Sequence, residues 1–195
     1  MKLLGPALFL IAPLALVACG GAATPPAEAP PAATTTTPAA APATTLSVRS
    51  IEVPLAAKSD SKLSGKATFT EVEGGVKVKV QVAGAPPGKI ATHVHEKGDC
   101  SAPDGASAGG HFNPASHPHA LPPSAERHLG DLGNIDVGAD GSGSTEITIQ
   151  GASLKEGDPN SFLGKAIIVH AKQDDGGQPV GNAGGRIGCG VIGGK

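Results

Sequence analysis

The chain is poor in aromatic residues. Among its 195 residues it has no Trp and no Tyr, and only four Phe. A hydrophobic core must therefore be built mainly from Val, Ile, Leu and Ala. An excess of basic residues is also lacking, because the formal net charge is −2 with histidine neutral. This charge balance excludes the basic surface that a nucleic-acid-binding protein needs.

No segment shows a sustained helical period of apolar residues. Residues 76–82, V-K-V-K-V-Q-V, instead alternate strictly, which predicts a half-buried strand. Gly74-Gly75 before them predicts a hairpin with residues 66–73. Further strands are predicted at residues 134–137, 145–149 and 166–169. Short strands with glycine-rich connections indicate one all-β sandwich or barrel over residues 46–195.

A long hydrophobic run suited to a membrane-spanning helix is missing too. Residues 1–18 carry one charge, Lys2, and then an apolar run that is too short and too interrupted by proline to span a bilayer well. This pattern predicts a secretory signal peptide. Residues 16–19, L-V-A-C, resemble the bacterial lipobox, in which the cysteine is lipidated and becomes the mature N-terminus. The alternative is an ordinary secretory signal with a chance cysteine at position 19.

The next segment, residues 19–45, has low sequence complexity. After Cys19 it consists almost entirely of Pro, Ala, Thr and Gly, which leaves no apolar pattern to bury and favours extended conformations. We expect a tether that holds the domain away from a membrane. A glycosylated stalk is the alternative.

The chain has three cysteines, and an odd number in an exported protein needs an explanation. If Cys19 carries lipid, Cys100 and Cys189 remain as a pair. An oxidising periplasm or cell surface would let these two cysteines form a disulfide.

Two predicted connections, residues 97–132 and 171–185, are too long to be simple turns. A long loop without structure of its own is usually functional or disordered. Five of the seven histidines lie between residues 95 and 128. Neutral imidazole suits zinc and copper, and a carboxylate can complete a zinc site. The histidines therefore indicate that the first connection is functional.

Five motifs carry a resemblance to a known family. They are H-V-H-E (93–96), G-G-H-F-N-P (109–114), R-H-L-G-D-L-G-N (127–134), I-V-H-A-K (168–172) and G-N-A-G-G-R-I-G-C-G-V-I-G (181–193). On these motifs the chain resembles copper,zinc superoxide dismutase. The resemblance implies a Greek-key β-sandwich or barrel of immunoglobulin-like architecture with two long functional loops. It also implies copper and zinc as cofactors and superoxide as the substrate, which is dismuted to oxygen and hydrogen peroxide.

Carried over position by position, the resemblance implies two metal sites that share one histidine. The implied copper ligands are His93, His95, His111 and His170. The implied zinc ligands are His111, His119, His128 and Asp131. His111 would then bridge the metals as an imidazolate and take part in catalysis. His117 is a second candidate for the zinc position of His119, but the family's spacing from the bridging histidine selects His119.

The resemblance implies roles for two further residues. Arg186 matches an arginine beside copper, where a guanidinium that stays protonated would dock a small anion. Asp174 matches a carboxylate that hydrogen-bonds ligand histidines of both metals, with the adjacent Asp175 as the alternative. Residues 171–185 are shorter than the corresponding loop of animal relatives, so steering of superoxide is expected either to be weaker or to come from Lys97 or Lys172.

Other functions compete with dismutation. The same ligands would suit a surface protein that sequesters copper or zinc without turnover, although sequestration does not need Arg186. A copper-only relative is a second alternative, and the implied zinc ligands argue against it. A structural or adhesive lipoprotein is the third. The expected location is the bacterial cell envelope, at the periplasm or the cell surface, with a membrane anchor at Cys19. The oligomeric state stays open, a homodimer included.

Overall fold

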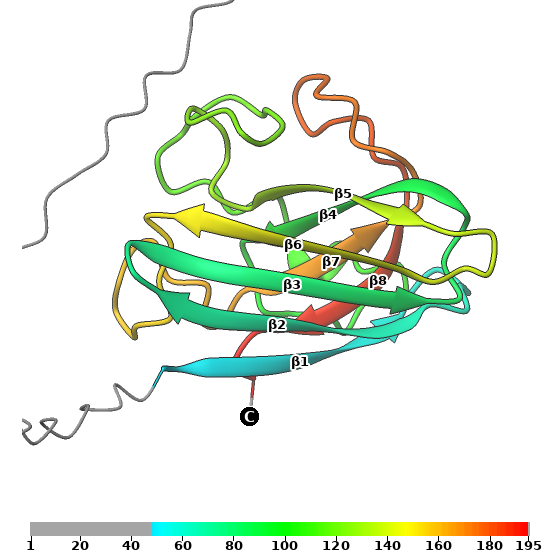
Figure 1. Ribbon diagram of the computed structural model, residues 1–195, viewed down its shortest axis with the longest axis horizontal. Helices are drawn as coiled ribbons and strands as arrows, with labels where there is room; N and C mark the ends of the chain where they lie inside the picture. Colours follow the sequence, from blue (N-terminus) through cyan, green and yellow to red (C-terminus); the bar gives the residue numbers. More distant parts are fainter. Residues whose placement is uncertain (1–47, 195) are drawn as a thin grey trace, which may run out of the picture. The chain divides into compact units, whose positions relative to one another are not determined.

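Eight β-strands run through residues 48–194, which are the part of the chain that the computed structural model describes (Figure 1). The strands are β1 (Ser50–Ala57), β2 (Ser64–Val72), β3 (Gly75–Ala83), β4 (Gly88–His95), β5 (Asp131–Val137), β6 (Gly143–Gln150), β7 (Ala166–His170) and β8 (Arg186–Val191). One short 3-10 helix, η1 (Ala106–Ala108), lies between β4 and β5. The predicted strands at residues 66–73, 76–82, 134–137, 145–149 and 166–169 are confirmed to within a few residues.

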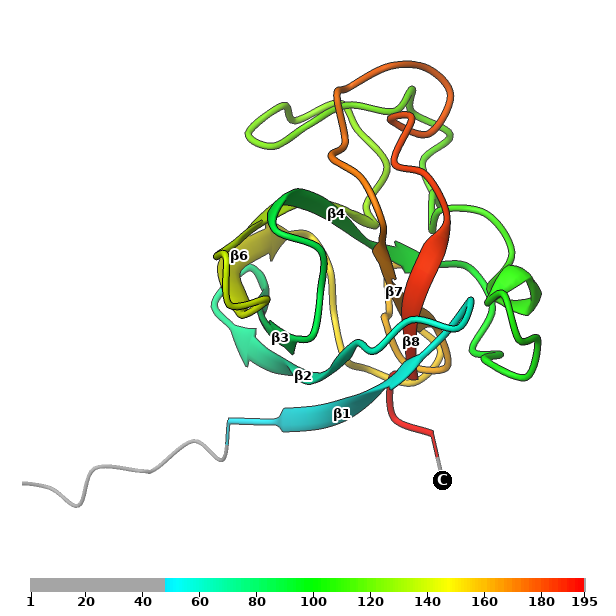
Figure 2. The same ribbon diagram turned by 90° about the vertical axis from the view of Figure 1, so that its right-hand side faces the viewer.

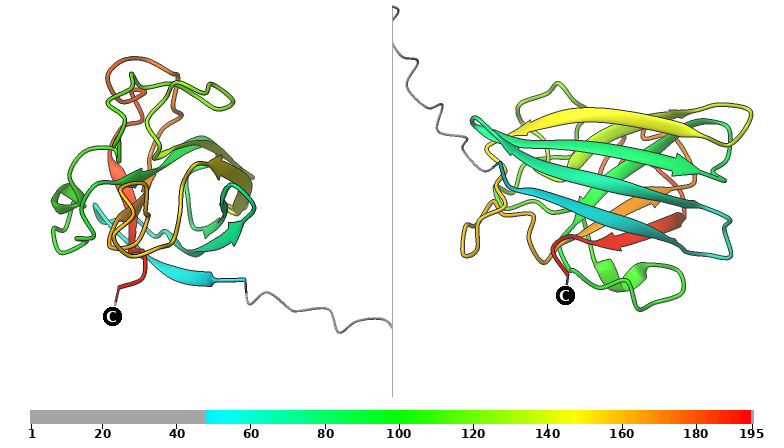
Figure 3. Two further views of the ribbon diagram at one scale, coloured as in Figure 1. Left: turned by 90° about the vertical axis from the view of Figure 1, so that its left-hand side faces the viewer. Right: turned by 60° about the horizontal axis from the view of Figure 1, so that its bottom comes forward.

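The strands form a closed antiparallel barrel in the order β1-β2-β3-β6-β5-β4-β7-β8. The barrel closes where Ala56 and Ala57 of β1 pair with Cys189 and Gly188 of β8, and Figure 3 shows these two strands side by side. Along the chain β3 leads to β4, but in the sheet β3 pairs with β6. This crossover confirms the expected all-β Greek-key barrel.

The core follows from the alternation in the sequence. In β3 the valines point inward and the lysines between them are more exposed, as the strict alternation of residues 76–82 predicts. Three phenylalanines join the aliphatic residues: the Phe162 ring lies 6.0 Å from the rings of both Phe69 and Phe112, edge to face. Because Phe112 follows His111 directly, this contact fixes the histidine-bearing loop to the core.

The two long connections emerge from the same side of the barrel. In Figures 1 and 2 the later, lime part of the connection between β4 and β5 lies next to the orange to red loop between β7 and β8. Hydrogen bonds between His119 and Gln178 and between Asn134 and Asp174 join this second loop to the first loop and to β5. None of the helices in residues 48–194 is long and apolar enough to cross a membrane.

Three of the sequence predictions fall on residues 1–47 and lie outside the described residues. These are the signal peptide at 1–18, the lipidation of Cys19 and the tether at 19–45. They therefore stay predictions.

Candidate metal centre

Two neighbouring strands supply three buried histidines. In β4, His93 and His95 are two residues apart and almost fully buried, with exposures of 0% and 1%. His170 is the last residue of β7, which pairs with β4, and its ring centroid lies 4.9 Å from that of His93. The H-V-H spacing thus places two imidazoles where the end of the adjacent strand adds a third.

His111 reaches the same place because its loop pairs with the end of β4. The Phe112 N–H donates to Val94 O at 2.9 Å, and the Val94 N–H donates to Gly130 O at 2.8 Å. Position 130 needs glycine, because a Cβ there would lie 2.2 Å from Val94 O. Glu96 adds to this arrangement by accepting from the Gly110 N–H at 3.2 Å, so it is less peripheral than its exposed position suggests.

His93, His95, His111 and His170 form the first group of candidate ligands, each with a ligand atom within 4.8 Å of the others. Three of these residues use one ring nitrogen for a hydrogen bond: His93 Nε2 with Asp174, His95 Nδ1 with Gly109 O and His170 Nδ1 with Gly184 O. The opposite nitrogens, His93 Nδ1, His95 Nε2 and His170 Nε2, are buried without a hydrogen-bond partner among the described residues. Buried polar atoms are normally paired, so this arrangement fits a metal ion.

His111, His119, His128 and Asp131 form the second group, also within 4.8 Å. His111 Nδ1 lies 3.2 Å from His128 Nδ1 and 2.9 Å from Asp131 Oδ1, and the latter oxygen lies 3.3 Å from His128 Nδ1. His119 Nδ1 is 3.0 Å from Asp131 Oδ2 but lacks the geometry of a hydrogen bond. Tetrahedral zinc with bonds of about 2.0–2.1 Å has edges of about 3.3 Å between its ligand atoms. The three-histidine, one-carboxylate set therefore fits zinc.

Asp174 connects the two groups. Its Oδ2 lies 2.8 Å from His93 Nε2, and its Oδ1 lies 2.9 Å from His119 Nε2. The adjacent Asp175 instead accepts from the Gly177 N–H and from Asn182 within its own exposed loop. The geometry thus places Asp174, and not Asp175, between the histidines.

Burial disfavours the charged form of His93, His95 and His170. It lowers the pKa of His95 to about 2 and that of His170 to about 3, against a usual value of 6.5. Burial also lowers the pKa of His93. For Asp174, burial raises the pKa, but hydrogen bonds from His93 and His119 outweigh it and hold the pKa below its usual value. Neutral imidazole and ionised carboxylate are the protonation states that metal ligands need.

Arg186 lies at the start of β8 beside the first group. Its Nη1 donates to Gly105 O at 2.8 Å and its Nη2 donates to Gly109 O at 2.7 Å, and Gly109 O also bonds His95 Nδ1. Burial lowers the pKa of Arg186, and the nearby carboxylate of Asp104 opposes that shift. The guanidinium is therefore held in place next to a copper-ligand candidate.

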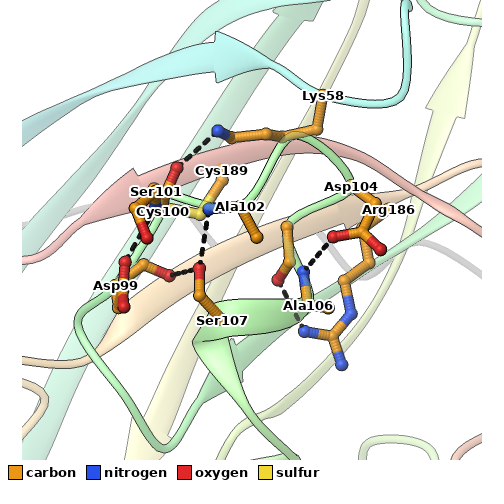
Figure 4. Close-up of a disulfide and its surroundings, with 11 residues drawn as sticks. Lys58, Asp99, Cys100, Ser101, Ala102, Asp104, Ala106, Ser107, Arg186 and Cys189 are labelled. Carbon is orange, nitrogen blue, oxygen red and sulfur yellow. Dashed lines mark hydrogen bonds between the residues drawn. A yellow bond between two sulfur atoms is a disulfide. The ribbon is translucent and has the colours of Figure 1, made fainter.

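The Cys100–Cys189 disulfide joins the connection between β4 and β5 to β8 (Figure 4). The two Cα atoms are 5.8 Å apart across a sequence separation of 89. Around it, the Lys58 ammonium donates to Cys100 O, and the Ser107 hydroxyl donates to Asp99 O at 3.0 Å. The bridge fixes the segment whose carbonyls hold Arg186.

Residues 63–192 match the family described as copper/zinc superoxide dismutase (SODC). The chain belongs to this family. It is therefore a superoxide dismutase that uses copper and zinc. An extracellular superoxide dismutase (Cu-Zn) of Brugia pahangi is 35% identical over 159 residues, which are 76% of this chain and 78% of the relative. Superoxide dismutase (Cu-Zn) 2 of Aquifex aeolicus (strain VF5) is 38% identical over 139 residues, 69% of this chain and 81% of the relative.

Solved structures show the same fold. A crystal structure of the clock protein EA4 has a TM-score of 0.66 and 37% identity, covering 73% of this chain and 92% of that one. A crystal structure of a SOD-like protein from Bacillus subtilis has a TM-score of 0.65 and 33% identity, covering 72% of this chain and 97% of that one. Both likenesses agree with the closed barrel of this dismutase.

His117 is outside both groups of candidate ligands. Its backbone is held by Asn113, which donates to His117 O at 2.8 Å and accepts from the His117 N–H at 3.1 Å. The side chain that joins the second group is that of His119, as the family spacing implies.

Sequence reasoning missed two amide side chains that support this dismutase site. Asn134 bonds the backbone of Asp174, and Gln178 bonds the backbone of His119. Asn134 lies inside the motif at residues 127–134, which was an available signal. Gln178 lies in none of the five motifs, so only the structure identifies it.

Proposed function

We propose that this dismutase protects the cell envelope from superoxide and that its metals are held by the two histidine groups. His93, His95, His111 and His170 would hold copper, and His111, His119, His128 and Asp131 would hold zinc. The observation that supports this assignment is that both groups contain buried ring nitrogens without a hydrogen-bond partner in residues 48–194. His111 belongs to both groups and is therefore the proposed bridging residue.

Copper held by the first group of histidines would supply the one-electron redox chemistry that dismutation needs. The chain's own residues handle binding and protons. His111 Nδ1 lies among the zinc-ligand candidates, so its Nε2 is the nitrogen left for the copper side. We expect this Nε2 to hold a proton during turnover and to deliver it to the peroxide product.

Arg186 would bind the substrate. Two of its N–H groups are used by Gly105 O and Gly109 O, and a guanidinium has five in total. The remaining donors and the positive charge can dock a small anion next to His95. A protein that only sequestered metal would not need such a group, which argues against the sequestration alternative.

Dismutation by the purified, metal-loaded protein tests the assignment. We expect His111→Ala to remove most of the activity, because the variant loses the proposed bridge and its proton carrier. His117→Ala is the matched control and should keep both the activity and the metal content. A wild-type protein that bound both ions stoichiometrically without turnover would support sequestration instead.

The proposed site of action is the bacterial cell envelope, with lipid at Cys19 and residues 19–45 as the tether. A disulfide at Cys100–Cys189 and a relative named as extracellular are consistent with export. The lipobox-like residues 16–19 support the anchor.

A further inference from the structure

The backbone of His119 is bonded from the other long loop. The Gln178 Nε2 donates to His119 O at 2.6 Å, and the His119 N–H donates to Gln178 Oε1 at 3.2 Å. One side-chain amide thus satisfies both polar backbone groups of a candidate zinc ligand. The two residues are 59 positions apart in the chain.

The same loop also holds the imidazole of His119. Asp174 Oδ1 lies 2.9 Å from His119 Nε2, which directs Nδ1 toward the zinc group. Asp174 is in turn fixed by Asn134 of β5, which donates to Asp174 O at 3.0 Å and accepts from the Asp174 N–H at 2.8 Å. Ring and backbone of His119 are therefore both positioned from residues 171–185.

The other zinc-ligand candidates are held more locally. The Asp131 N–H donates to His128 O at 3.0 Å, and the His128 N–H donates to Asp131 Oδ2 at 3.1 Å. His128 and Asp131 thus fix each other over three residues at the start of β5. Near His119, Asp131 bonds the backbone of the following residue, with the Ala120 N–H donating to Oδ2 at 3.3 Å. Both polar backbone groups of His119 itself are bonded from the other loop.

We propose that Gln178 is a positioning residue for zinc, acting through the backbone of His119. This inference rests on the proposed assignment of His119 to the zinc site. Without Gln178, the backbone of His119 would lose both of its hydrogen bonds and could shift between His117 and Ala120, so His119 would leave the ion more often. Zinc would then dissociate faster, while copper would be retained, because Gln178 bonds none of the copper-ligand candidates. Gln178 is exposed, so we expect the effect to be about tenfold, at the lower end for residues that support metal ligands.

The test measures zinc release to a chelator from protein loaded with both metals, together with copper content. Gln178→Ala removes both bonds. Gln178→Glu keeps the size and the acceptor but places a carboxylate oxygen against His119 O, so it should release zinc at least as fast as Gln178→Ala. The visible spectrum of protein with cobalt in the zinc site should change in both variants, because it reports the ligand geometry.

Asn182→Gly is the matched control. It removes another amide from residues 171–185, and within residues 48–194 this amide bonds Asp175 alone. Glycine tolerates the positive φ of 52° at this position. We expect this variant to release zinc at the wild-type rate. Equal acceleration in Asn182→Gly and Gln178→Ala would overturn the proposal, since general loosening of the loop would then explain the loss.

Two further results separate this inference from the ligand assignment. Zinc release at the wild-type rate from both Gln178 variants would refute the positioning role and leave the assignment intact. Unchanged zinc content in His119→Ala would refute the assignment itself. Loss of copper together with zinc in the Gln178 variants would also contradict the proposal, because it predicts a selective effect.

Discussion

Three buried histidines of the metal centre use one ring nitrogen for a hydrogen bond within the protein and have the other available for a metal ion. His93, His95 and His170 each bond Asp174 or a backbone carbonyl with one nitrogen, and the other nitrogen is buried without a partner in the described part of the chain. The H-V-H spacing predicted the pairing of the first two on one strand. It did not say which nitrogen of either ring faces the metal, because that choice depends on acceptors from distant loops.

The proposed docking of superoxide by Arg186 can be tested with a single substitution. Arg186→Ala should lower kcat/KM for superoxide roughly tenfold to a hundredfold, the effect of losing a charged hydrogen bond of about 1.5–3 kcal/mol. Metal content should not change, because Arg186 is in neither ligand group. Steady-state or pulse kinetics on fully loaded protein measures the effect.

Arg49→Ala is the control for that substitution. The Arg49 guanidinium also bonds a backbone carbonyl, Leu154 O at 2.6 Å, and Arg49 belongs to neither ligand group. It should keep the wild-type kcat/KM. An Arg186→Ala protein with unchanged kcat/KM would remove the argument for anion docking.

At the scale of elements, β4 and β7 bring buried histidines together between paired strands. A strand whose residues are buried on both faces usually carries apolar side chains, but the last four residues of β4 include His93 and His95. Burial lowers the pKa of His95 to about 2 and of His170 to about 3. Without metal, these strands are therefore packed around imidazoles that must stay neutral.

This packing predicts that the metal-free protein loses stability in mild acid. The unfolded chain takes up protons on histidine below pH about 6.5, while the folded chain takes them up on His95 and His170 only near pH 2–3. As the pH is lowered through this window, the free energy of unfolding should therefore decrease by about 1.4 kcal/mol per pH unit for each such histidine. Asp131 and Asp174, whose pKa values are lowered, would add to the loss only below about pH 4.

Thermal unfolding of metal-free protein from pH 7 to pH 5 measures this effect, and Tm should fall steadily. Protein loaded with both metals is the comparison, because bound metal competes with the protons and should flatten the dependence. A Tm of the metal-free protein that stayed constant over this range would contradict the role of the buried histidines.

At the scale of the whole molecule, the predicted anchor and the barrel have separate tasks. The barrel at residues 48–194 carries every candidate ligand, whereas residues 1–45 carry the expected signal and tether. Cys19→Ala should therefore release the protein from the membrane fraction without lowering its dismutase activity. Fractionation of cells followed by an activity assay measures both. Continued membrane association of Cys19→Ala would contradict the lipid anchor.

The sequence by itself determined the local features of this protein. Alternating valines in residues 76–82 define β3, because this pattern is short-range. The family motifs imply which histidines, together with Asp131, gather at the metal centre. Only the tertiary structure decided how distant segments meet. The pairing of β1 with β8 closes the barrel by joining its first and last strands. Gln178 bonds the backbone of His119, which is 59 residues away in the chain. Such contacts depend on where the folded chain places each segment, and a side-chain amide in a loop has no local pattern that reveals its partner.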